Sequence, residues 1–356
     1  MSRLSLREWL RVSRWKAQLG TLALAGAGAW CFLWLGVPLP WLFGPMCFCL
    51  VAGLMRAPLV TNDAMTMASR LIIGVTAGTA ITPDVVAHIP RMAYTVAIVP
   101  LFVATAGLVG VPYFMRVCGF DRATAYYAAM PGGLTDMVLF GREAGGDERA
   151  LALVHTTRVV ATVALLPVLL AYAFDLDFTP PDKAQVSPTP MTELLLMGIA
   201  GYAGWRIALR LRLFGAPVLG PLILGAALSL TGLVEHRPPA EVISAAQFFL
   251  GVALGAGYVG VTFAELGGKV LAGVVYVLIL AALAGFVTEV VVQLGLLSPL
   301  EGLLAFAPGG QAEMMLLALA AGADIGIVVV HHLVRLVLII LAAPLVASRL
   351  RLGPRK

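Results

Sequence analysis

The stretch Pro131-Gly132-Gly133-Leu134-Thr135-Asp136-Met137 lies inside a long apolar segment, and a close copy of it, Pro308-Gly309-Gly310-Gln311-Ala312-Glu313-Met314, begins 177 residues later. Proline lacks the amide proton that a helix uses, and glycine permits positive φ angles that other residues avoid. Each copy therefore predicts a break within a membrane helix. Backbone groups freed by such a break cannot face lipid, so we expect each break to be buried in protein or to line a wet cavity.

The similarity between the two halves extends beyond the break. After the shared Met137 and Met314, four further residues recur at the same spacing without a gap: Gly145 as Gly322, Asp147 as Asp324, His155 as His332 and Arg158 as Arg335. Chance similarity between apolar helices would not align such different residues over this distance. The sequence predicts a first membrane repeat over 1–172 with a basic cytoplasmic N-terminus, a polar linker over 173–190 and a second repeat over 191–356.

Composition indicates an all-α, polytopic membrane protein. Hydrophobic residues make up 60% of the 356 residues and charged residues only 12%, with a mean hydropathy of +0.95. Several apolar stretches reach about 20 residues, the length of a helix that crosses a bilayer. The alternating pattern of an outer-membrane barrel is missing from the sequence. The net charge of +5 fits basic cytoplasmic loops and does not favour direct binding of nucleic acid.

The distribution of Lys and Arg predicts the topology. If each Pro-Gly-Gly segment turns back as a re-entrant hairpin, each half crosses five times and most basic residues lie inside, leaving Arg91, Lys183 and Arg237 outside. If both segments cross, Arg206 and its basic neighbours are stranded outside. We therefore predict two inverted repeats of about five transmembrane helices, each with a broken or re-entrant helix. The protein would lie in the inner membrane with both termini cytoplasmic.

A carboxylate follows each break by one helical turn, at Asp136 and Glu313. One interpretation is a helix cap, in which the carboxylate accepts hydrogen bonds from first-turn amides. The other is an ion or proton site, because carboxylates at membrane depth are costly. Both interpretations stay open. The two segments are not chemically equal, because Thr135 in the first half corresponds to Ala312 in the second.

His155 and Arg158 lie three residues apart, so they share one helical face, and His332 and Arg335 repeat the arrangement. An arginine inside an apolar helix needs a partner. We expect this partner among the acids Asp136, Glu313, Asp147 and Asp324. Each arginine could clamp hairpin to helix or attract an anionic substrate, and both roles are compatible. The histidines could exchange protons, although a hydrogen-bonded packing role is the simpler interpretation; His331 has no counterpart in the first half.

The remaining candidates carry less chemistry. Arg70 corresponds to Gln247 in the second half, so the arginine is not repeated. This fits either an arginine at the membrane interface or a contact to substrate. The four cysteines lie in or beside apolar segments and fit packing better than metal binding. The sequence holds no hydrolase, phosphate-loop or zinc-protease signature, so we predict no enzyme, no metal and no cofactor. The predicted substrate or ion site comprises Pro131, Gly132, Gly133, Asp136, His155, Arg158, Pro308, Gly309, Gly310, Glu313, His332 and Arg335.

The doubled pattern Pro-Gly-Gly-x-x-[Asp/Glu]-Met, then Gly-x-Asp, then His-x-x-Arg, over 131–158 and 308–335, resembles the AbrB-like membrane family. That family is defined by a duplicated hydrophobic region, and the resemblance covers about 20 to 348. It is distinct from the small DNA-binding transition-state regulator that shares the name. The resemblance implies two labels, regulator of gene expression and ammonia monooxygenase. The residues support neither, since the sequence holds no DNA-reading module and no cluster of metal ligands.

The duplicated breaks with acidic and basic groups favour a secondary transporter or exporter of a small solute, with an anion coupled to protons as the sharper form. The alternative is a membrane-embedded regulator that acts through a protein partner. A membrane enzyme is the least favoured class. Expected partners are the lipid bilayer and a small-molecule or ion substrate, and assembly as a homo-oligomer stays open.

Overall fold

The computed structural model describes residues 6–37, 39–83, 86, 92–176, 189–213, 215–350 and 352, with side chains from residue 15 onward. All secondary structure in these ranges is helical, which confirms the all-α prediction. Arg91, Lys183, most of the predicted linker and the first residues of the basic N-terminus lie outside the described residues.

The chain divides into two compact units that do not follow the sequence halves. Unit 1 comprises Met1–Ala80 and Asp177–Thr262, and unit 2 comprises Ile81–Leu176 and Phe263–Lys356. Each unit therefore takes the corresponding part of both halves. The early helices of both halves pack together in unit 1, and the late helices of both halves pack together in unit 2.

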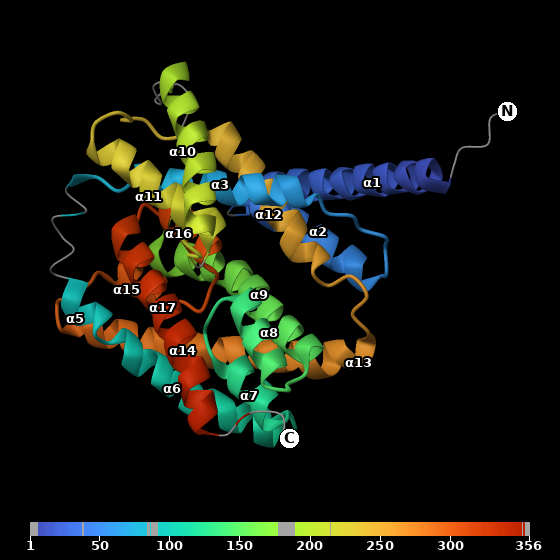
Figure 1. The fold of residues 1–356 in the computed structure, drawn as a ribbon, viewed down its shortest axis with the longest axis vertical. Coiled ribbons are helices and arrows are strands. Elements are labelled where there is room, and N and C mark those ends of the chain that lie inside the picture. Colours follow the sequence, from blue (N-terminus) through green and yellow to red (C-terminus); the bar gives the residue numbers. More distant parts are fainter. Residues whose placement is uncertain are drawn as a thin grey trace. The chain divides into compact units, whose positions relative to one another are not determined.

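The described residues of unit 1 form six helices, three from each half (Figure 1): α1 (Leu6–Trp34), α2 (Pro40–Leu54), α3 (Asp63–Thr79), α10 (Met191–Arg210), α11 (Ala216–Leu230) and α12 (Ala240–Ala256). Helix α2 packs against α1 and α12, and α11 packs against α10 and α3. The two halves thus make the same contacts with the roles exchanged, as a duplicated sequence predicts.

Glycines set the distance between the helices of unit 1. The Cα of Gly28 on α1 faces the backbone of Gly44 on α2, and in the second half Gly204 on α10 faces Gly220 on α11. A Cβ at any of these positions would overlap backbone atoms of the facing helix. Close approach of helix backbones through small residues is the usual packing mode in lipid, where hydrophobic burial does not drive association.

Unit 2 holds the late helices of both halves: α5 (Ala93–Val96), α6 (Val99–Pro112), η2 (Tyr113–Val117), α7 (Arg122–Ala129), α8 (Leu134–Glu143), α9 (Glu148–Phe174), α13 (Phe263–Glu265), η4 (Leu266–Val270), α14 (Leu271–Gln293), α15 (Pro299–Phe306), α16 (Gln311–Ala320) and α17 (Ile325–Arg349). Helix α14 packs against α6, α9 and α15, and α17 packs against α6, α15 and α16 (Figure 1). The η segments are short π-helical turns.

Repeated caps fix where the helices of unit 2 begin. Asp121 accepts hydrogen bonds from the first amides of α7, and Ser298, 177 residues later, caps α15 in a capping box with Glu301. Asp147 caps α9, and its counterpart Asp324 caps α17. Side-chain oxygens at these positions satisfy amides that the helix itself leaves free.

Five helices in the described ranges are long and apolar enough to cross a membrane. They are Trp15–Trp34, Ala93–Val117, Glu148–Phe174, Phe263–Gln293 and Ile325–Arg349. Four shorter apolar helices of 10–17 residues accompany them, at Pro40–Leu54, Ala216–Leu230, Ala240–Ala256 and Gln311–Ala320. The protein therefore has the character of a membrane protein, in agreement with the hydropathy of its sequence.

Candidate functional site

The first Pro-Gly-Gly segment separates α7 from α8, and α8 returns alongside α7. Near the end of α8, the Cα of Gly141 lies next to the Cβ of Tyr127, and Gly146 lies next to Thr124 at the start of α7. The backbone amide of Asp147 donates to Oγ1 of Thr124 at 2.7 Å. The start of α7 and the end of α8 therefore lie close together. We call α7, the break at 130–133 and α8 the first hairpin, and α15, 307–310 and α16 the second broken segment.

His155 and Arg158 on α9 bind the carbonyl groups that the first break exposes. Nη1 of Arg158 donates to the oxygen of Met130 at 3.2 Å, and Nη2 donates to the oxygen of Gly132 at 2.5 Å. Nε2 of His155 lies 3.1 Å from the oxygen of Tyr127. A carbonyl only accepts, so this nitrogen carries the proton. Both side chains are buried, with 0% exposure for His155 and 3% for Arg158.

The second half repeats these contacts at equivalent residues. Arg335 donates from Nη1 to the oxygen of Ala307 at 2.6 Å and from Nη2 to the oxygen of Gly309 at 3.0 Å. Nε2 of His332 lies 2.9 Å from the oxygen of Leu304. In both halves the histidine reaches back 28 residues, and the arginine reaches back 28 and 26 residues. The His-x-x-Arg motif is thus a device that satisfies the carbonyls of a broken helix.

The two histidines differ in their second nitrogen. Nδ1 of His332 accepts a hydrogen bond from Nη2 of Arg335 at 3.2 Å. Nδ1 of His155 has no partner within the described residues, and neither has Nε of Arg158. More of the buried nitrogens of the His-x-x-Arg motif therefore have hydrogen-bond partners in the second half than in the first.

The glycines of the breaks act through their missing side chains. The glycines do not use the positive φ angles that glycine permits: Gly133 has φ −66° and Gly310 has φ −77°, and all four break glycines fall outside the left-handed region. A Cβ on Gly132 would crowd Met137 and Ile339, and a Cβ on Gly309 would overlap Met314. Glycine is needed because the methionine of each following helix packs directly on the break.

The acids Asp136 and Glu313 fold back over the N-cap glycines that precede their helices. A Cβ on Gly133 would meet the carboxylate of Asp136, and a Cβ on Gly310 would meet that of Glu313. Both positions are the third residue of a helix, where a carboxylate favours the positive end of the helix dipole. This geometry favours the capping interpretation for Asp136.

The hydrogen-bond partners of the arginines differ from the acid partners that we expected, although Glu313 interacts electrostatically with Arg158. We expected the arginines to bind the acids of the motif, whereas their hydrogen bonds go to carbonyl oxygens. Asp324 caps α17, and Asp147 caps α9 and pairs with Lys269, whose Nζ lies 2.8 Å from Oδ2. The sequence misled because it gives the acids near the motif but not the direction in which the chain returns.

The two broken segments contact each other's long helix within unit 2. The Cα of Gly132 lies against Ile339 of α17, and the hydroxyl of Tyr126 donates to the oxygen of Ala343 on the same helix at 3.0 Å. Reciprocally, α16 packs against α9. The charge of Arg158 interacts with that of Glu313 and with that of Arg335. The structure therefore brings the basic groups of both halves and Glu313 into one region.

Two residues that sequence reasoning missed or ranked low complete this region. Tyr276 on α14, 1% exposed, donates its hydroxyl to the oxygens of Ala129 at 2.6 Å and Ala106 at 3.0 Å, so it satisfies another carbonyl at the first break. His331 bridges its own helix and Oγ1 of Thr95 at 3.0 Å. Neither residue has an equivalent in the other half, so the repeat could not reveal them.

The other candidates lie apart from this chemistry. Arg70 belongs to α3 in unit 1 and is exposed, which favours an interfacial role. The four cysteines are free thiols, with Cys49 buried. Within the described residues no three His, Cys, Asp or Glu side chains gather in a way that could hold a metal ion.

Comparison with known proteins finds similarity over most of the chain. The family model described as "Transition state regulatory protein AbrB" matches residues 41–351. "Uncharacterized protein YhjN" of Bacillus subtilis (strain 168) is 26% identical over 349 residues, covering 91% of this chain and 90% of that protein. "Putative regulator AbrB" of Escherichia coli (strain K12) is 22% identical over 319 residues, covering 89% of this chain and 91% of that protein. The chain therefore belongs to the AbrB family.

Proposed function

We propose that this chain is a secondary transporter of the inner membrane that moves a small solute, with an anion as the sharper form of the proposal. One observation carries it: each helix break is held by a buried arginine, Arg158 or Arg335, that binds carbonyls of the break. A continuous helix would satisfy these carbonyls without any charge. The chain instead buries one arginine at each of the two breaks in unit 2. Burying a cation at membrane depth is costly, and here each cation stabilises non-helical backbone.

Broken helices from two repeats are the recurrent way in which transporters expose backbone groups and helix ends to a solute. Here the free helix ends are the N-termini of α8 and α16, which follow the breaks and carry the positive end of the helix dipole. The charges of Arg158 and Arg335 add to this field, and Glu313 is the acid that interacts with Arg158. An electropositive region of this kind suits an anion, and a carboxylate within it suits coupling to a proton.

The topology that we propose for this function has ten crossings. The return of α8 along α7 supports a re-entrant first hairpin, and by the repeat we extend this to the second segment. Five crossings per half make the two repeats inverted, with both termini cytoplasmic. We propose no enzymatic reaction, cofactor or direct contact with nucleic acid. A homo-oligomer is compatible with this topology.

Currents on a solid-supported membrane test the proposal. Proteoliposomes are exposed to concentration jumps of carboxylates, amino acids and inorganic anions at fixed pH. We expect a current for at least one solute, reduced at least tenfold by Glu313→Gln, which removes the acid that interacts with Arg158. Glu289→Gln, an exposed acid on α14, is the matched control and should leave the current unchanged. Currents absent for the whole panel, or a current of Glu313→Gln equal to that of the unmodified chain, would count against transport.

The alternative is a membrane-embedded regulator that acts through a protein partner. The printed names of the family and of the Escherichia coli relative favour it. It predicts a protein bound to the cytoplasmic loops and no solute current. Cross-linking in cells through loop residues such as Arg142, followed by identification of a captured transcription factor, would support this alternative over transport.

A further inference from the structure

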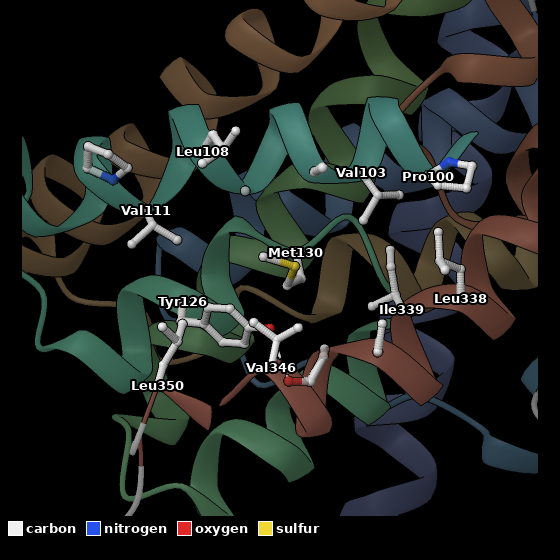
Figure 2. Close-up of a pocket in the computed structure, with 15 residues that line it drawn as sticks. Pro100, Val103, Leu108, Val111, Tyr126, Met130, Leu338, Ile339, Val346 and Leu350 are labelled. Carbon is white, nitrogen blue, oxygen red and sulfur yellow. Dashed lines mark hydrogen bonds between the residues drawn. The ribbon is translucent and has the colours of Figure 1, made fainter. Parts of the chain in front are cut away.

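An apolar groove runs along unit 2 between α6 and α17. Its volume is about 560 Å³, and its floor includes Met130, the first residue of the break, and Tyr126 (Figure 2). The walls are formed by small and aliphatic side chains of the two helices, among them Ala104 and Leu108. Leu108 is 75% exposed, so the groove opens sideways and not only at its ends. Volumes of this size accommodate a ligand, and this lining accommodates an apolar one.

The groove has the length of one membrane leaflet. It extends from Pro100 to Pro112 on α6 and from Leu338 to Leu350 on α17, so that the late residues of both helices lie at the same end (Figure 2). Twelve residues at 1.5 Å per residue span about 18 Å. Half of the hydrocarbon core of a bilayer is about 15 Å. An acyl chain that enters from the lipid can therefore extend along the groove as far as the hairpin.

Exposed basic residues lie within one turn of the groove lining at one end of the groove. Arg116 follows Pro112 by one turn, Arg122 precedes Tyr126 by one turn, and Arg349 adjoins Leu350. All three arginines are exposed, and none makes an ion pair or a side-chain hydrogen bond within the part of the chain that the structure describes. Asp121, the acid next to Arg122, is engaged in capping α7. At the other end, Arg335 precedes Leu338 by one turn, but it is buried and binds the carbonyls of the second break.

We infer that this groove binds an anionic phospholipid of the cytoplasmic leaflet. One acyl chain lies between α6 and α17 and reaches Met130, and the phosphate lies at Arg116 and Arg349. Basic pockets between membrane helices on the cytoplasmic side suit anionic headgroups, and a neutral solute would leave the three arginines without a partner. Because Met130 also supplies a carbonyl to Arg158, the bound chain would pack against the residue at which the first helix breaks. The inference uses the proposed cytoplasmic side but not solute passage.

Native mass spectrometry of the full chain in detergent tests this site with two probes, phosphatidylglycerol and phosphatidylcholine of identical acyl chains. We expect one phosphatidylglycerol to be retained in preference to phosphatidylcholine. The double variant Arg116→Gln/Arg349→Gln should weaken this retention by on the order of tenfold, since each basic residue near a membrane surface contributes several-fold to anionic lipid binding. Ala104→Leu, which fills the groove from an exposed position, should abolish retention.

Two matched controls keep the result specific. Arg206→Gln/Arg210→Gln removes two exposed arginines of α10, and Ala281→Leu adds the same side chain at an exposed position of α14 outside the groove. Both should retain phosphatidylglycerol as the unmodified chain does.

Equal retention of the two lipids by the unmodified chain would overturn the inference. Retention of phosphatidylglycerol by Ala104→Leu at the level of the unmodified chain would overturn it too. Disulfide-linked dimers of a Leu108→Cys variant would also overturn it, because they would assign the groove to a second copy of the chain. None of these readouts involves flux, so they stand or fall separately from transport.

Discussion

Arg158 and Arg335 make the same contact in the two halves: each spans, with two nitrogens, the carbonyls that lie 28 and 26 residues before it. The equivalence extends to the histidine three residues earlier, which binds a carbonyl 28 residues before it. The His-x-x-Arg motif, which recurs in the sequence, therefore also makes the same hydrogen bonds in both halves. Its first task is to make a broken helix stable where water is scarce.

Replacing either arginine should destabilise unit 2. Arg335→Ala leaves the carbonyls of Ala307 and Gly309 without that partner, and each buried unsatisfied group costs about 1–3 kcal/mol. We expect a loss of at least about 2 kcal/mol in the free energy of unfolding. Arg335→Lys should recover part of this loss because one ammonium cannot reach both oxygens as a planar fork does. Thermal unfolding in detergent measures it, with Arg210→Ala as an exposed control; equal melting temperatures would contradict the clamp.

The two histidines should respond unequally to substitution. His332→Ala removes a donor to Leu304 and an acceptor from Arg335, whereas His155→Ala removes only the donor to Tyr127. We expect His332→Ala to cost about 1 kcal/mol more, the net contribution of one hydrogen bond. The same thermal measurement on both variants compares them. A larger loss of stability for His155→Ala would contradict a stabilising hydrogen bond between His332 and Arg335.

Glycines of α1 should show opposite effects according to their surroundings. Gly28→Ala places a methyl group in the backbone of Gly44 and should destabilise by about 1–3 kcal/mol. Gly26→Ala on the same helix has open space around it and should be neutral or stabilising by up to about 1 kcal/mol, because alanine favours helix. The pair Gly204→Ala and Gly198→Ala on α10 repeats this contrast. Chemical denaturation in mixed micelles gives the sign, and loss of stability in Gly26→Ala would contradict the packing.

The junction between α9 and η4 should weaken in acid. Burial alone would raise the pKa of Asp147, but hydrogen bonds from Lys269 and from the amide of Ala150 hold the pKa of this carboxyl below its ordinary value. A carboxyl with a lowered pKa in the folded state contributes stability that is present above its unfolded pKa, about 3.9, and is lost as the pH falls through the folded pKa. Stability should therefore decline from about pH 5 downward.

Thermal melts of the unmodified chain and of Asp147→Asn between pH 3 and pH 7 follow this effect. The Asn variant should be less stable at pH 7 and should lose less of its stability on acidification. Lys269→Gln should raise the pKa of Asp147 and move the decline toward higher pH. Parallel pH profiles for all three proteins would show that the pair contributes nothing.

The proposed topology predicts which loops are shielded from outside. In a variant without the four native cysteines, a cysteine at Arg142 or Arg210 should resist a membrane-impermeant maleimide in intact cells and react after lysis. A cysteine at Arg237, which the same topology puts outside, should react directly. External labelling at Arg142 or Arg210 would contradict ten crossings.

The sequence by itself determined the all-helical membrane character, the duplication and the positions of both breaks. These depend on local chemistry: hydropathy, the helix-breaking action of Pro131 and Pro308, and identities that recur 177 residues apart. Tertiary structure alone decided what the arginines bind, because carbonyls and carboxylates are both good acceptors and only the return of α8 along α7 selects between them. It also decided the role of the break glycines, since contact with Met137 and Met314 is invisible in a backbone propensity. Tyr276 and His331 came to these sites through packing between distant helices, which no spacing within one repeat encodes.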